Sequence, residues 1–143
     1  MTDLMLAKEE LSRHTLVLAK DGKVITSDKR GVAPMVDFLR EGKNFSGFFA
    51  ADKVIGKAAA MLFIKADVKE VFGETVSQSA KELFESCGVR VSYNTLVPYI
   101  VNRDKTGMCP MESTVFSVSD VETGVKLIFE KLDKMREAHN RRG

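Results

Sequence analysis

Residues 45–65 read F-S-G-F-F-A-A-D-K-V-I-G-K-A-A-A-M-L-F-I-K, an apolar stretch whose charged residues are one aspartate and three lysines. The short run 45–51 is typical of a buried strand, and residues 53–65 predict a well-buried helix. A buried strand that leads into a helix is the first half of a crossover unit in an α/β protein. This stretch therefore indicates the fold class, and its neighbours show how the sheet is completed.

The chain before this stretch predicts a β-hairpin between two helices. The runs T-L-V-L-A-K and K-V-I-T-S, at 15–20 and 23–27, flank Asp21–Gly22. An Asp-Gly pair between two β-rich runs is the strongest short-range hairpin signal. Apolar residues at helical spacing predict the helices, at 3–12 and from Val32 to Leu39.

The chain after this stretch continues the alternation of strands and helices. We expect strands at 68–72 and 89–93 on either side of a helix at 76–87, and a long amphipathic helix from Val121 onward. Strands that alternate with helices imply a largely parallel sheet. The expected fold is a single domain over residues 1–143, a three-layer α/β/α sandwich around a mixed five-stranded sheet with an N-terminal β-hairpin.

Composition and charge exclude several functional classes. The formal net charge of +2 is too small to argue for a nucleic-acid partner, and 44% hydrophobic residues are ordinary for a globular domain. The chain has no apolar run of about 18 residues and does not begin like a signal peptide, so we expect a cytoplasmic protein with no membrane partner. Two cysteines and two histidines make a zinc or copper site improbable, so neither a metal nor another cofactor is expected.

The residues after the 45–51 strand form the first candidate site. Ligands of open α/β sheets bind outside the carboxyl ends of strands, where helices begin. We expect Asp52 to cap the helix, and Lys53 and Lys57 to lie one helical turn apart, where an anion would offset their repulsion. A glycine inside a helix, at Gly56, suggests close approach of a ligand or backbone. In the alternative interpretation, the lysines extend from a buried helix into solvent and Gly56 is a packing residue.

The second candidate site is N-R-D-K-T-G-M-C-P-M-E-S-T, residues 102–114, within a long segment that has no clear periodicity. Cys109 precedes a proline and Glu112 follows three residues later, a pattern typical of a helix start. A thiol at such a position can be reactive, but Cys109 could equally be a small apolar cap. Asn102 and Arg103 could hold an anion or a partner's carboxylate, or could face solvent.

The order of elements over residues 3–94 resembles the cytidine deaminase-like fold. Zinc deaminases of that fold carry a His/Cys-x-Glu motif and a P-C-x-x-C motif, where this chain has G-V-A-P-M-V (31–36) and D-K-V-I-G-K (52–57). Because the zinc ligands and the glutamate are missing, hydrolytic deamination is not expected. The stretches F-F-A-A-D-K-V-I-G-K-A-A-A and 102–114 also resemble an uncharacterised bacterial domain family placed in this fold. That resemblance implies a bacterial or archaeal cytoplasmic setting and no assigned activity.

Two functional hypotheses follow, and the sequence leaves open whether the protein is an enzyme. In the first, a pocket binds an anionic small molecule, with nucleotide-like compounds among the options. Its ligand-binding residues would be Asp52, Lys53, Gly56, Lys57, Asn102, Arg103 and Glu112, and its candidate base or nucleophile Lys53, Lys57 or Cys109. In the second, the scaffold is a non-catalytic interaction or regulatory domain that forms homo-oligomers.

Overall fold

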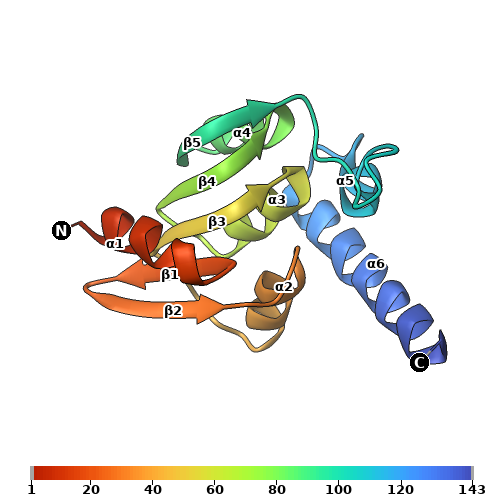
Figure 1. The fold of residues 1–143 in the computed structure, drawn as a ribbon, viewed down its shortest axis with the longest axis horizontal. Helices are drawn as coiled ribbons and strands as arrows, with labels where there is room; N and C mark the ends of the chain where they lie inside the picture. Colours follow the sequence, from red (N-terminus) through yellow and green to blue (C-terminus); the bar gives the residue numbers. More distant parts are fainter. Residues whose placement is uncertain (1, 143) are drawn as a thin grey trace.

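The computed structural model describes residues 2–142 and contains one mixed five-stranded sheet with helices on both faces (Figure 1). The strands lie in the order β2-β1-β3-β4-β5. β1 is antiparallel to β2 and β3, whereas β3, β4 and β5 are parallel. This confirms the mixed five-stranded sheet. The strands are β1 (Leu16–Lys20), β2 (Lys23–Ser27), β3 (Phe49–Ile55), β4 (Glu70–Ser77) and β5 (Arg90–Val97).

The helices cover the two faces of the sheet unequally. On one face, Ala7 of α1 and the adjacent Leu11 pack against strand residues that include Val17 and Phe72. The main core lies on the other face, beneath α2, α3 and α4, and α6 packs against α3. The helices are α1 (Asp3–Glu10), a 3₁₀ turn (Leu11–Arg13), α2 (Ala33–Arg40), α3 (Lys57–Lys65), α4 (Gln78–Ser86), α5 (Pro110–Val115) and α6 (Val121–Arg142).

The predicted hairpin is confirmed, and its turn is held from outside. Asp21 and Gly22 have φ angles of 52° and 79°, as a two-residue hairpin turn requires. The carboxylate of Asp3 accepts hydrogen bonds from both of their backbone amides, at 2.9 and 3.1 Å. The N-terminal helix is thereby joined to the tip of the hairpin.

The prediction of a strand at 45–51 and a helix from residue 53 is wrong in its boundaries. Residues before Phe49 form a turn, in which the Ser46 amide donates to Asn44 Oδ1 and Gly47 has a φ of 82°. β3 then continues to Ile55, because it is paired on both sides, with β1 through Asp52 and with β4 as far as Ile55. The first candidate site therefore lies in a strand and the turn after it.

The ends of two further strands also differ from the predictions. β4 and β5 continue beyond their predicted ends at 72 and 93, since parallel pairing extends both ladders. Ser77 at the end of β4 caps α4 by accepting from the Ala80 amide at 3.2 Å. At the start of α6, Asp120 accepts from the Thr123 amide at 2.9 Å. Within residues 2–142, no helix is both long and apolar enough to cross a membrane.

Candidate functional site

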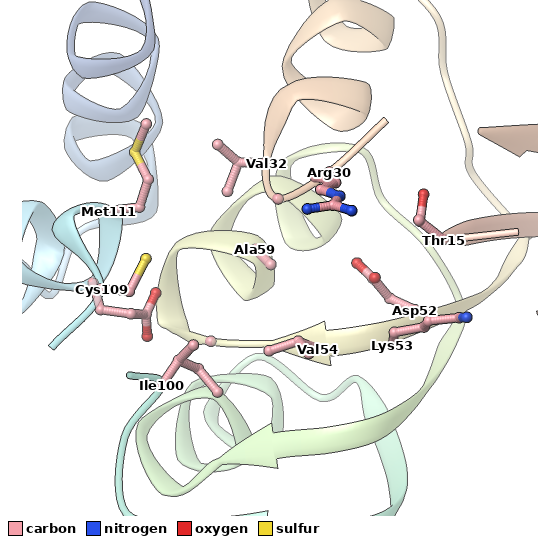
Figure 2. Close-up of a pocket in the computed structure, with 13 residues that line it drawn as sticks. Thr15, Arg30, Val32, Asp52, Lys53, Val54, Ala59, Ile100, Cys109 and Met111 are labelled. Carbon is pink, nitrogen blue, oxygen red and sulfur yellow. The ribbon is translucent and has the colours of Figure 1, made fainter. Parts of the chain in front are cut away.

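A cavity of about 280 Å³ lies at the carboxyl end of β3, between the beginnings of α2 and α3 and the segment that leads into α5 (Figure 2). β2 and β3 both run antiparallel to β1, so the chain that leaves β2 toward α2 emerges at this same edge of the sheet. The cavity is lined by Thr15, Arg30, Gly31, Val32, Asp52, Lys53, Val54, Gly56, Ala59, Ile100, Cys109, Met111 and Glu112.

One end of the cavity contains opposite charges. Asp52 lies opposite Leu16 in the β1–β3 ladder, and its carboxylate points into the cavity toward the Arg30 guanidinium (Figure 2). Burial raises the pKa of Asp52 to about 7, and the backbone amides of Lys53 and Val54 act in the opposite direction. The carboxyl group of Asp52 is therefore able to gain or lose a proton near neutral pH.

The backbone of Arg30 is placed at the mouth of the cavity by the chain that precedes it. The Thr15 hydroxyl bonds to the backbone carbonyls of Ser27 and Lys29, at 2.8 and 2.6 Å. These bonds anchor the connection between β2 and α2, and Arg30 follows directly. Its side chain is exposed, and none of the ion pairs described within residues 2–142 involves it.

The other end of the cavity is built around Glu112, whose side chain is buried. Its carboxylate accepts from the backbone amides of Lys57 at 2.7 Å and Ala58 at 3.0 Å, and so caps α3 from another helix. Burial raises the pKa of Glu112, and the two amides and the Lys57 charge partly offset this rise. A Cβ atom on Gly56 would overlap the Glu112 carboxyl group, so a side chain at this position would displace that carboxyl group.

Gly56 is therefore not inside a helix, as predicted, but is the N-cap of α3. The carboxylate that occupies the start of α3 belongs to the protein itself. Asp52, which was expected to cap this helix, lies on β3, four residues before the N-cap Gly56. The Glu112 carboxylate therefore occupies the place, at the start of α3, where the sequence predicted a bound anion.

The two lysines of the first candidate site are not brought together as predicted. Lys53 lies on β3, and Figure 2 shows its ammonium group directed away from the Asp52 carboxylate. Lys57 is the first residue of α3 and lines a smaller hollow on the other side of Glu112, where its ammonium group donates to the Phe116 carbonyl at 3.2 Å. The helical-turn spacing on which their pairing depended is absent, because β3 extends through Lys53.

The 102–114 segment contributes its second half to the cavity. Cys109 and Glu112 both line it, and Pro110 begins α5 as predicted. Asn102 and Arg103 line neither this cavity nor the hollow beside Lys57. Asn102 instead holds a turn, since its side-chain oxygen accepts from the Thr106 amide at 3.0 Å.

Sequence reasoning missed Arg30, Thr15 and Ile100. For Arg30 a signal was present: where β1 pairs antiparallel with both β2 and β3, the residues after β2 lie at the carboxyl edge of β3. Ile100 has no such signal, because its position depends on an irregular connection after β5. Within residues 2–142, no group of three or more His, Cys, Asp or Glu side chains is arranged to hold a metal ion.

Comparisons with known proteins identify a family and a fold. A family model described as a domain of unknown function (DUF1893) matches residues 3–132. The crystal structure of a DUF1893 family protein (TM1506) from Thermotoga maritima superposes with a TM-score of 0.83 and 24% identity, over 92% of this chain and 91% of that one. At this identity the likeness shows a shared fold. No curated protein matches the sequence.

Proposed function

Because this chain belongs to the DUF1893 family of unknown function, we propose its function from the cavity itself: the domain binds a small anionic molecule that has an apolar body. The observation that carries the proposal is the position of Arg30, an arginine without an ion-pair partner among the described residues, at the mouth of an apolar cavity. A guanidinium group matches carboxylates and phosphates through paired hydrogen bonds. The apolar walls would contact the rest of the ligand.

The anion is assigned to the Arg30 end because the Arg30 guanidinium offsets the charge of Asp52 there, whereas at the other end the Glu112 carboxylate already occupies the start of α3. Glu112 satisfies the first amides of α3, so a second anion there would meet its charge. Lys53 also lines the cavity, but its ammonium group is directed away from the Asp52 carboxylate, so the positive charge assigned to the anion is that of Arg30. Among the candidate catalytic residues, Cys109 lines the cavity together with Lys53, whereas Lys57 lies in the neighbouring hollow.

The proposed fold is a cytidine deaminase-like fold that has a ligand cavity in place of a zinc centre. In support, the cavity lies between the beginnings of α2 and α3, the two places where zinc deaminases of that fold carry their motifs. The donor set does not fit zinc, because these places hold Gly31–Val36 and Asp52–Lys57 without histidine or cysteine. Hydrolytic deamination is therefore not part of the proposal.

Binding is tested by calorimetry and thermal shift with small carboxylates, inorganic phosphate and nucleoside monophosphates. We expect at least one anion with an apolar body to bind the wild type. Arg30→Ala should weaken the affinity for this anion at least tenfold. Arg103→Ala is the matched control, because it removes an arginine outside the cavity. Equal affinities in the two variants, or no binding across the panel, would contradict the proposal.

A second candidate function, a self-associating interaction domain, is favoured by exposed apolar side chains near the end of β5. Val54, Leu96, Tyr99 and Val101 are 49%, 37%, 46% and 46% exposed, and three of them line a hollow of about 470 Å³. Sedimentation velocity distinguishes this function from simple ligand binding. An oligomer that Tyr99→Ser dissociates would support it, and a monomer at high concentration would contradict it.

A further inference from the structure

Asp52 occupies a position that the fold itself would fill with an apolar side chain. Its neighbours on the same face of the sheet are Leu16, Leu18 and Ala50, all fully buried or nearly so. A carboxylate in such surroundings loses hydration, which is unfavourable without a cation or strong donors nearby. In the part of the chain described, the groups that stabilise its charge are two backbone amides, those of Lys53 and Val54.

Across the same cavity, the Arg30 guanidinium faces Asp52, and yet the two form no ion pair with each other (Figure 2). The backbone just before Arg30 is anchored by the Thr15 hydroxyl, and Asp52 is fixed on the central strand. Two opposite charges that face the same cavity without pairing with each other are complementary to a molecule that carries both charges itself. Such a molecule would place its anionic group against Arg30 and its cationic group against Asp52.

We infer that the ligand of this cavity is a small zwitterion of the amino-acid type, whose carboxylate binds Arg30 and whose ammonium group binds Asp52. This inference rests on the proposed function, since it adds a second charge to the anion already assigned to Arg30. It makes Asp52 the residue that selects among small acids. An acid that lacks the amine would leave the half-buried Asp52 carboxylate without its partner.

The remaining walls determine the kind of side chain that the zwitterion carries. Val32, Val54, Ala59, Ile100 and Met111 provide an apolar lining, and about 280 Å³ is at the small end for ligand cavities. An aliphatic side chain of a few carbons fits this volume and chemistry. An acidic side chain would be directed toward Glu112 and is disfavoured.

The test compares each ligand with its own fragments on the wild-type chain. Thermal shift with the twenty L-amino acids selects the best ligand, and calorimetry at pH 8 then compares it with its desamino acid and its decarboxylated amine. For leucine these analogues are 4-methylpentanoate and 3-methylbutylamine. We expect the amino acid to bind at least tenfold more tightly than either analogue.

Two variants assign the two ends of the ligand. Asp52→Asn, which keeps the shape of the side chain, should weaken binding of the amino acid at least tenfold and should not weaken binding of the desamino acid. Arg30→Ala should weaken the binding of both the amino acid and its desamino acid, and Arg103→Ala should weaken the binding of neither. If no amino acid binds more tightly than its desamino acid, the zwitterion is refuted while anion binding at Arg30 stands. If no acid of any kind responds to Arg30→Ala, the proposed function fails as well.

Discussion

Gly56→Ala tests how the end of β3 is joined to α5. A Cβ atom at this position would overlap the Glu112 carboxyl group, so the carboxylate must leave the amides of Lys57 and Ala58. A hydrogen bond to a charged group contributes about 1.5–3 kcal/mol, and part of this loss is offset because the displaced carboxylate regains hydration. We expect Gly56→Ala to lower the free energy of unfolding by about 2–4 kcal/mol.

The assay is urea unfolding followed by far-ultraviolet circular dichroism, with Gly107→Ala as the matched control. Gly107 has no heavy atom within 4 Å of an added Cβ, so its substitution should change stability by no more than about 0.5 kcal/mol. In a Glu112→Ala background the overlap is gone, and Gly56→Ala should then cost less than about 1 kcal/mol. If Gly56→Ala lowered the free energy of unfolding equally with and without Glu112→Ala, contact with Glu112 would not be the reason that glycine stands at position 56.

Three further predictions concern the rest of the chain. Burial raises the pKa of Asp52 from 3.8 to about 7, so the folded protein binds this proton more tightly than the unfolded chain does, and stability should fall as pH rises between these values. Asp52→Asn should remove up to about 4 kcal/mol of this pH-dependent loss of stability. The measurement is the free energy of unfolding in urea at pH 4–8, and the same pH dependence in wild type and variant would contradict the prediction. Asp3→Ala leaves the amides of Asp21 and Gly22 without their acceptor and should lower the free energy of unfolding by about 1 kcal/mol. This is measured as a lower urea midpoint, and the control Asp28→Ala should lower the midpoint less. Arg40 binds both Asp133 oxygens, at 2.8 and 2.9 Å, and lies over the Phe129 ring. Arg40→Ala should therefore lower the free energy of unfolding by about 1–2 kcal/mol, and Arg40→Lys should lower it less. Equal thermal unfolding midpoints for wild type and Arg40→Ala would count against a role of Arg40 in docking α6.

Local signals in the sequence were sufficient for most of the fold. Asp21–Gly22 predicted the hairpin because two residues with positive φ are needed there, and the alternation of strands and helices predicted the mixed sheet. The end of β3 was misplaced because its pairing with β1 and β4 is a tertiary effect. That pairing overrides the helical appearance of residues 53–56.

The candidate site was only partly predictable for the same reason. Gly56 was correctly identified as a point of close approach, but the approaching group is Glu112, which lies 55 positions from the amide of Lys57 that it caps. No local pattern connects residues so far apart. The position of Arg30 could have been predicted from the topology of the sheet. The separation of Lys53 from Lys57 could be predicted only with the correct start of α3.

The most direct test of the central claim is a ¹H–¹⁵N correlation spectrum titrated with the best-binding amino acid. We expect progressive shifts of the backbone amides that surround the cavity, at Gly31, Val32, Val54 and Ala59, and no shifts along α1 or the second half of α6. Arg30→Ala should abolish the shifts at the same ligand concentration. Shifts confined to the hollow near Tyr99, or saturable binding that leaves these four amides unmoved, would contradict the account.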